Sequence, residues 1–328
     1  MIAAEAVLHV LISTFGFLGS LINMIVLYAL FKVKVGSQIT GVLLRFQCVF
    51  DGLTGSLAFL YQVVGPEIVT GWNTLDRILC TIWYGDSLTW IGISCSVCNV
   101  VCMSTDRAAA VFCPVVYQTQ QLALIILSFL YVFVVSITLF LSNLFDRSFV
   151  DGRCHFVQVF NSEALRTFLI AENYMWLAFI YLFPFCIISG ANAAVLIYMM
   201  RKWKVSKTES RKHLSRINEQ FRIYRRAREI ALTTAFMAMT LLVCHAYDAV
   251  TYTMDASGLY DYVILSVKQQ AGLLPIIVST TILPCISAGR IKSLREYILI
   301  NMIQMGLAKI GLESSPNPIA TGSQAQFG

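Results

Sequence analysis

Residues 95–117 read CSVCNVVCMSTDRAAAVFCPVVY, and they place a pair of charges at the end of an apolar helix. Asp106 and Arg107 stand side by side after a nearly uncharged run, and Pro114 and Tyr117 follow where the helix should stop. Charged residues are costly to hold in a membrane-length helix, and they mark functional sites there. The stretch therefore predicts such a site, provided that the rest of the chain builds a membrane bundle around it.

The composition indicates an integral membrane protein. Of the 328 residues, 57% are hydrophobic and only 13% are charged, whereas soluble domains carry roughly a quarter charged residues. The net charge of +6 is therefore interpreted by its position relative to the membrane, and we expect no nucleic-acid partner. The spans contain no HExxH, GxSxG or paired-carboxylate motif, so we expect neither an enzyme nor a bound cofactor.

Seven mostly apolar runs are long enough to cross a bilayer, for which a helix needs roughly 20 residues. The first run lacks a basic start and a clear small-residue cleavage site, so it is interpreted as a span and not as a signal peptide. The sequence predicts an all-α membrane protein, a seven-transmembrane helix bundle within a domain at 1–303. The predicted spans cover 6–31, 42–64, 80–111, 122–144, 170–200, 229–253 and 263–288.

The distribution of Lys and Arg predicts the orientation. With the N-terminus outside, most of the 24 basic residues fall on the cytoplasmic side, as the positive-inside rule requires. The largest group lies in 201–228, which we expect to continue the fifth and sixth helices into the cytosol. This basic loop predicts a docking surface for a cytosolic partner, a face near anionic lipid, or both. We expect a multi-pass protein of the plasma membrane.

The C-terminal part of the chain changes character after the seventh span. Residues 290–303 alternate polar and apolar positions with helical period, which predicts an amphipathic helix at the membrane interface. Residues 304–328 contain many Ser, Pro, Gly and Gln and predict a mostly disordered cytoplasmic tail.

Two groups of cysteines differ in their surroundings. Cys95, Cys98 and Cys102 share one helix face, but no His or carboxylate lies near enough in sequence to complete a metal site, so we expect packing. Cys80 and Cys154 lie in polar connecting segments that the predicted topology places outside, where disulfides persist.

The local motifs resemble those of rhodopsin-like G-protein-coupled receptors, and the resemblance is to a divergent, invertebrate-type member. Asp106-Arg107-Ala108 with Pro114 and Tyr117 is similar to the family's Asp-Arg-Tyr motif and its downstream Pro and Tyr. Further matches are the first-span Asn signature (Gly19, Asn23, Val26), the buried sodium-site aspartate (Asp51) with a third-span partner (Ser96), the fifth-span proline (Pro184), and the outer disulfide pair (Cys80, Cys154). The matches extend over about residues 10–300.

Other positions depart from the family pattern. His245 stands where the sixth-span tryptophan is usual, Leu283 precedes Pro284 where the seventh span usually has Asn, and Asn192 replaces a fifth-span tyrosine. A sodium ion at Asp51 would lack its seventh-span ligand. The segment from Cys80 to the Asp-Arg pair is two residues longer than usual, which predicts an irregular turn where the third helix begins.

The resemblance implies a ligand pocket in the outer half of the bundle. Asp86, Asp248 and Glu172 would make its mouth acidic, which favours a cationic ligand such as an amine or a basic peptide; the alternative is that these acids are simply solvated at the rim. Thr89 occupies the position of the family's amine-binding aspartate, so a peptide is favoured over an amine. The candidate pocket residues are Asp86, Thr89, Trp176, His245, Asp248, Gln269 and Leu273.

The predicted function is a receptor that couples an extracellular ligand to a heterotrimeric G protein. Arg107 would rest on Asp106 and be released to the partner, or else the pair would be a structural helix end. Asp51 would form an ion node or a structural hydrogen-bond node with Asn23. The alternatives are a seven-helix transporter or channel, or a chemosensory receptor that acts without a G protein. A photoreceptor is disfavoured because Ile277 stands where the Schiff-base lysine is needed.

Overall fold

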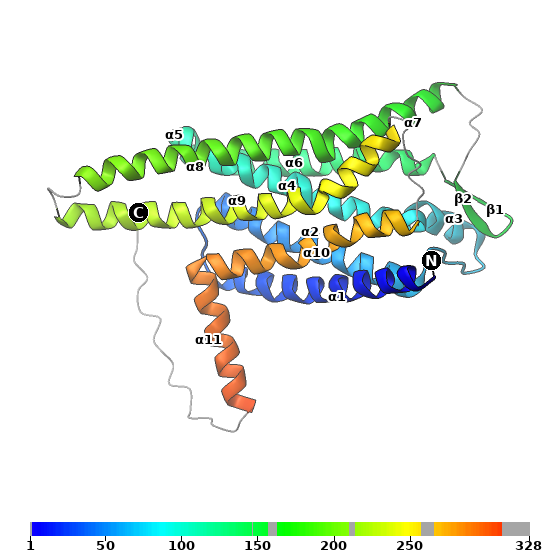
Figure 1. The fold of residues 1–328 in the computed structure, drawn as a ribbon, viewed down its shortest axis with the longest axis horizontal. Coiled ribbons are helices and arrows are strands. Elements are labelled where there is room, and N and C mark those ends of the chain that lie inside the picture. The colour runs from blue at the N-terminus through cyan, green and yellow to red at the C-terminus, as the bar shows by residue number, and fades with distance from the viewer. Residues whose placement is uncertain (1, 146, 157–162, 210–213, 257–265, 310–328) are drawn as a thin grey trace.

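The computed structural model describes residues 2–145, 147–156, 163–209, 214–256 and 266–309. Within these ranges, seven helices are long and apolar enough to cross a membrane, which confirms the predicted seven-helix bundle. They lie roughly alongside one another, and the N-terminus lies at the same end of the bundle as the two short strands (Figure 1).

The spans are built from α1 (Ile2–Lys32), α2 (Gln38–Val64), α3 (Asn73–Ile82) continued by α4 (Ser87–Phe112), α6 (Gln121–Phe140), α7 (Glu163–Trp176) continued by α8 (Phe183–Glu209), α9 (Leu214–Ala256) and α10 (Val267–Arg290). A short helix, α5 (Pro114–Thr119), follows α4, and a hairpin of β1 (Arg147–Val150) and β2 (Arg153–Phe156) follows α6. After α10, α11 (Lys292–Lys309) turns away from the bundle (Figure 1).

Residue chemistry explains several of these boundaries. The Ser37 hydroxyl accepts a hydrogen bond from the Thr40 amide at 3.3 Å and so caps α2. Ser266 caps α10 in the same way, with its hydroxyl 3.2 Å from the Gln269 amide nitrogen. Pro114 begins α5, a position where its missing N–H removes no helix hydrogen bond.

The third span is interrupted where the sequence predicted an irregular turn. Gly85 (φ 73°) and Asp86 (φ 62°) both adopt left-handed backbone conformations between α3 and α4. Gly tolerates this conformation freely, whereas Asp is one of the few other residues that adopt it. Asp86 is the residue immediately before α4, at the end of the bundle where the two short strands lie.

Other details differ from the sequence prediction. The fourth span ends as an α-helix at Phe140, and a 3₁₀ turn covers Leu141–Leu144. The fifth span contains a π-helical turn at Leu177–Leu182, which hydrophobicity alone does not reveal. Helix α11 extends to Lys309, so residues 304–309 at the start of the predicted, mostly disordered tail continue this helix. The remaining tail, 310–328, lies outside the described residues.

Small residues let the first helices pack closely. A Cβ atom added to Gly16 would lie 2.7 Å from the Gly55 carbonyl oxygen, and one added to Gly55 would lie 2.7 Å from the Gly16 carbonyl oxygen. The Ser20 hydroxyl donates to the Gly52 carbonyl at 2.8 Å beside this contact. Helices in membranes associate through such small-residue contacts, because lipid supplies no hydrophobic driving force between them. The packing fixes α1 on α2, which in turn lies against α4.

Candidate functional site

The charge pair Asp106–Arg107 lies near the end of α4, inside a cluster of hydrogen bonds. The Arg107 guanidinium is paired with Asp106, with Nε 3.0 Å from Oδ2, and it also donates to the Thr40 hydroxyl. Thr40 in turn donates to Asp106 Oδ2 at 3.2 Å. The side chains of Arg107 and Asp106 are only 10% and 2% exposed, so the pair is held inside the protein and does not reach into solvent.

Tyr117 closes this cluster from α5. Its hydroxyl lies 2.5 Å from the Ser37 hydroxyl and accepts a hydrogen bond from Arg107 Nη2 at 3.3 Å. Burial and the nearby Asp106 carboxylate raise the pKa of Tyr117, so the hydroxyl stays protonated at neutral pH. Pro114 contributes by starting the short helix that turns Tyr117 back onto α4. We call Ser37, Thr40, Asp106, Arg107 and Tyr117 the Arg107 cluster.

A small pocket lies beside the Arg107 cluster. Thr40 and the charge pair line one side of it, and Ile230, Thr233 and Thr234 of α9 line the other. The same part of α9 touches the α1–α2 turn, where an added Gly36 Cβ would lie 3.0 Å from Ile230 Cδ1. Helix α9 is therefore the wall that would have to move for another molecule to reach Arg107.

A second polar group lies in the middle of the bundle, between α2 and α4. The Ser96 hydroxyl donates to Asp51 Oδ1 at 2.6 Å, and the Gln47 side-chain amide donates to Asp51 Oδ2 at 2.9 Å. Asn99 donates to Gln47 Oε1 at 2.8 Å and to the Leu43 carbonyl at 3.0 Å. We call Gln47, Asp51, Ser96 and Asn99 the Asp51 network; all four residues are buried.

The structure places Asn23 apart from this network. Its amide donates to the carbonyls of Gly19 and Thr280, both at 2.8 Å, and so links α1 to α10. Among the described residues, no hydrogen bond joins Asn23 to Asp51, and Asn23 Oδ1 has no partner. The expected Asn23–Asp51 node is therefore replaced by two separate contacts, one between α1 and α10 and one between α2 and α4.

In the half of the bundle nearer the β1–β2 hairpin, Asp248 is hydrogen-bonded to the fifth span. It is 1% exposed and accepts a hydrogen bond from the Tyr181 hydroxyl in the π-helical turn. The Asp248 carboxylate also lies close to α10 at Gly272, where an added Cβ would be 3.3 Å from Asp248 Oδ1. Trp176 is the last residue of α7, just before the π-helical turn that carries Tyr181. Its ring packs edge-on against that of Trp90, with the centroids 5.9 Å apart.

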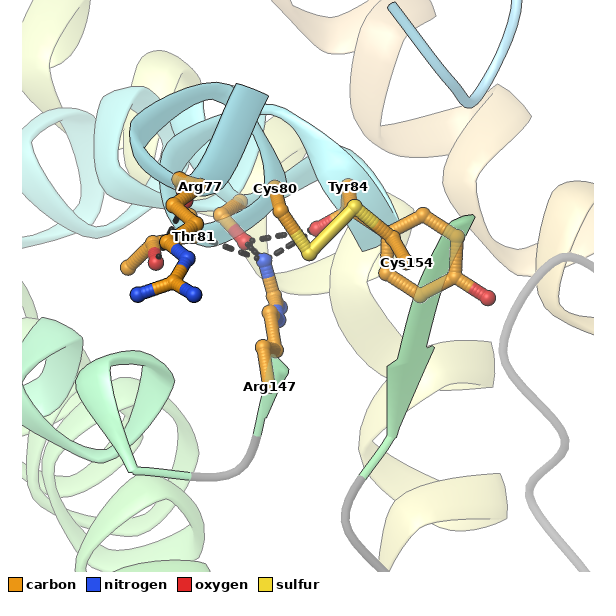
Figure 2. Close-up of a disulfide and its surroundings, with 7 residues drawn as sticks. Arg77, Cys80, Thr81, Tyr84, Arg147 and Cys154 are labelled. Atoms are coloured by element: carbon orange, nitrogen blue, oxygen red, sulfur yellow. Dashed lines mark hydrogen bonds between the residues drawn. A yellow bond between two sulfur atoms is a disulfide. The ribbon is translucent and has the colours of Figure 1, made fainter. Parts of the chain in front are cut away.

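Asp86 is controlled by a different residue, Arg147 of β1. Arg147 donates to the Thr81 carbonyl at 3.1 Å and to the Tyr84 carbonyl (Figure 2). It also donates to the Ser87 hydroxyl, one residue after Asp86. Its positive charge therefore lies against the irregular turn. Asp86 is 3% exposed, so it is not a solvated rim residue.

The predicted disulfide is confirmed. Cys80 of α3 and Cys154 of β2 are bonded, with Cα atoms 5.6 Å apart (Figure 2). Cys154 pairs with Phe149 in the hairpin, so the bond ties both strands to the start of the third span. Together with Arg147, the bond holds the hairpin over this end of the bundle, which we call the disulfide end.

The other predicted pocket residues are buried as well. Thr89 (1%), Leu273 (0%), Gln269 (4%) and His245 (6%) are all closed off from solvent, as is Glu172 (6%). His245 Nδ1 has no hydrogen-bond partner among the described residues. The burial of Asp86, Glu172 and Asp248 contradicts the alternative that these three acids are simply solvated at the rim.

Sequence reasoning missed several residues of these sites. Gln47 and Asn99 looked like isolated amides in apolar helices, although the four-residue spacing of Gln47 and Asp51 places them on one helix face. Ser37 and Thr40 looked like ordinary helix-start residues. Tyr181 gave no signal, because its direction depends on the π-helical turn.

The bundle and its disulfide define the class of protein: it has the seven-helix membrane fold of G-protein-coupled receptors. The solved structures that it resembles include the crystal structure of squid rhodopsin, with a TM-score of 0.69 and 13% identity over 94% of this chain and 87% of that chain. At this identity the likeness shows the fold alone. No protein-family profile matches the sequence, and no curated protein matches it.

Proposed function

We propose that this protein is a plasma-membrane receptor that passes the signal of an extracellular ligand to a heterotrimeric G protein. The observation that carries the proposal is the Arg107 cluster, a buried arginine paired with Asp106, Thr40 and Tyr117 near the end of the central helix, beside a pocket lined in part by α9. The positive-inside distribution of Lys and Arg supports a cytoplasmic position for this end.

The cluster suggests how the receptor would switch. In the resting state Arg107 is held by Asp106, Thr40 and Tyr117. Movement of α9 away from α2 and α4 would widen the pocket. The Arg107 guanidinium could then leave Asp106 and donate to backbone carbonyls of the G protein. A ligand that binds the open arrangement better than the closed one shifts the population toward it.

The basic segment 201–228 supplies a second contact in this proposal. Helix α8 continues into this segment as far as Glu209, and α9 begins within it at Leu214. Both helices extend past the end of α4 (Figure 1). Their Lys and Arg residues would meet acidic groups of the G protein and the anionic lipid surface. Helix α11 would lie on the same lipid, with Leu299 (51% exposed) and Ile300 (55% exposed) toward the acyl chains.

The ligand proposed for the outer half is cationic, an amine or a basic peptide. Asp248 supports this choice, because it is a buried acid that accepts a hydrogen bond from the Tyr181 hydroxyl, and the Tyr181 ring lies beside that of Tyr252. Asp86 is the weaker candidate for a salt bridge with the ligand, because Arg147 already places a positive charge beside it. The fold match to a rhodopsin does not extend to its chromophore attachment, since the fully buried Ile277 carries no amine.

The test is expression of the full chain with promiscuous G-protein reporters, screened against biogenic amines and neuropeptides. We expect a ligand-dependent signal that Arg107→Ala abolishes at equal surface expression. Thr138→Ala, which removes an exposed hydroxyl on α6 away from the proposed contacts, is the control and should signal normally. A ligand response that Arg107→Ala leaves intact would show that the switch is assigned to the wrong residue.

The ligand class is tested separately with Asp248→Asn. A charge-paired ligand should lose potency by about 30- to 150-fold, as expected when a buried charge partner is removed at a cost of about 2–3 kcal/mol. Asp86→Asn should have the smaller effect. Unchanged potency in Asp248→Asn would exclude a salt bridge between Asp248 and the ligand.

A further inference from the structure

The Asp51 network bears on a property that the resemblance implies, a sodium ion bound at Asp51. A sodium ion is a hard cation, and it would be held by oxygen lone pairs of the carboxylate, of Ser96 and of further groups around them. The arrangement of hydrogen-bond donors around Asp51 tests whether the residues of this chain fit such an ion.

The orientation of the Gln47 amide follows from its neighbours. Asn99 Nδ2 lies 3.0 Å from the Leu43 carbonyl, which only accepts hydrogen bonds, so this atom is the donor nitrogen. The Gln47 atom 2.8 Å from it must therefore be the oxygen, Oε1. The Gln47 nitrogen then faces the other way, toward Asp51 and Ser96.

Both hydrogens of that nitrogen are used at the place where a cation would lie. Gln47 Nε2 donates to Asp51 Oδ2 at 2.9 Å and to Ser96 Oγ at 2.7 Å. The Ser96 hydroxyl donates its own hydrogen to Asp51 Oδ1 at 2.6 Å. An ion in contact with both Asp51 and Ser96 would meet the partly positive N–H groups, so the residues present do not fit sodium.

Helix α10 adds no ligand. Among the described residues, none of the hydrogen bonds of the Asp51 network reaches α10, and Leu283, where the resemblance would place an amide side chain, is fully buried and apolar. The network is complete between α2 and α4, and its four members are between 0% and 6% exposed.

We propose that the side-chain amide of Gln47 takes the place of the sodium ion at Asp51. The amide supplies the positive ends of two N–H dipoles to the same two oxygen-bearing groups that an ion would bridge. It is covalently part of α2, so the contact between α2 and α4 does not depend on the salt composition outside the cell. This assignment goes beyond receptor signalling and holds whether or not the protein couples to a G protein.

The experiment measures the thermal unfolding midpoint of the purified full chain in lipid nanodiscs, in NaCl, KCl and choline chloride at equal ionic strength. The wild-type midpoint should be the same in the three salts. Gln47→Ala removes both donors and leaves the oxygens of Asp51 and Ser96, so its midpoint should be higher in NaCl than in the other salts. The double variant Gln47→Ala/Asp51→Asn should lose that sodium-specific increase.

Two results would overturn the proposal. One is a sodium-specific rise of the wild-type midpoint that Asp51→Asn removes, because sodium would then bind despite the amide. The other is a Gln47→Ala protein that folds and shows no sodium-specific rise, because the amide would then not be what excludes the ion. If Gln47→Ala does not fold, Gln47→Ser provides the same test with a smaller loss of polar contacts, and the wild-type measurement decides the first result by itself.

Discussion

Replacing Tyr117 by Phe removes one hydroxyl from the Arg107 cluster and should raise the ligand-independent activity of the proposed receptor. The ring is 8% exposed and would keep its packing. Only the hydrogen bonds to Ser37 at 2.5 Å and to Arg107 at 3.3 Å are lost. Because these bonds hold Arg107 in the closed arrangement, their loss destabilises that arrangement relative to one in which Arg107 is released.

The size of the effect follows from what remains after the substitution. Arg107 keeps Asp106 and Thr40, and Ser37 keeps its 2.7 Å contact with Thr40, so neither partner of the Tyr117 hydroxyl loses its last hydrogen bond. Of the two lost bonds, only the one to Arg107 acts on the guanidinium directly, so the closed arrangement loses about one ordinary hydrogen bond, about 1 kcal/mol. This changes the ratio of the two states about 5-fold. If the released state is a minor one at roughly 0.1–10%, basal signalling rises several-fold and stays below the full response.

The assay is basal reporter activity divided by the number of receptors at the cell surface. Tyr174→Phe is the matched control, since it removes a hydroxyl from a tyrosine that is 55% exposed and should leave basal activity unchanged. Adding Arg107→Ala to Tyr117→Phe should abolish the increase. Basal activity equal to or below that of the wild type, at equal surface expression, would refute the restraining role of the hydroxyl.

Two further predictions concern stability. Gly92→Ala should lower the unfolding free energy by about 1–3 kcal/mol, because the new Cβ would overlap Thr54 Oγ1 and lie 3.3 Å from Thr54 Cα. Gly190→Ala, whose new Cβ would have nothing within 4 Å, should be neutral. Equal thermal midpoints for the two variants would contradict this packing argument. Cys80→Ser should lower the thermal midpoint and make it insensitive to reducing agents. The reason is that a disulfide across 74 residues is worth about 4 kcal/mol of loop-closure entropy. A wild-type midpoint that reduction does not change would show that the disulfide does not stabilise the fold.

The sequence was sufficient for the fold because the signals concerned are long or strongly constrained. A membrane span must be about 20 apolar residues, so seven spans are visible without any knowledge of contacts. The Cys80–Cys154 bond was predictable for a similar reason, since both cysteines lie in polar segments that the topology brings to one side. The irregular turn at Gly85 and Asp86 was predictable from the length of the segment before Arg107.

The partners within the site were not predictable, because each depends on how helices rotate and pack. Asn23 was expected to meet Asp51, but the close contact of α1 with α2 directs its amide to the Thr280 carbonyl of α10. Gln47 reaches Asp51 because both lie on the α2 face that packs on α4. The acids predicted at the mouth of the pocket are buried, and two residues that no motif marks lie beside them: Arg147 at the turn that holds Asp86, and Tyr181 at Asp248.

The two polar groups between α2 and α4 belong to one seam. On α2, Thr40, Gln47 and Asp51 are separated by seven and four residues, so they fall on one helix face. The restraints on Arg107 therefore come from α2, α4 and α5, whereas α9 contributes only the wall of the pocket. The proposed arginine switch therefore does not depend on the sixth- and seventh-span motifs that are usual in the family the sequence resembles and that this chain lacks. The residues that hold Arg107 do not lie in those spans. In the proposed switch, α9 needs only to move away from Arg107 for the pocket to open.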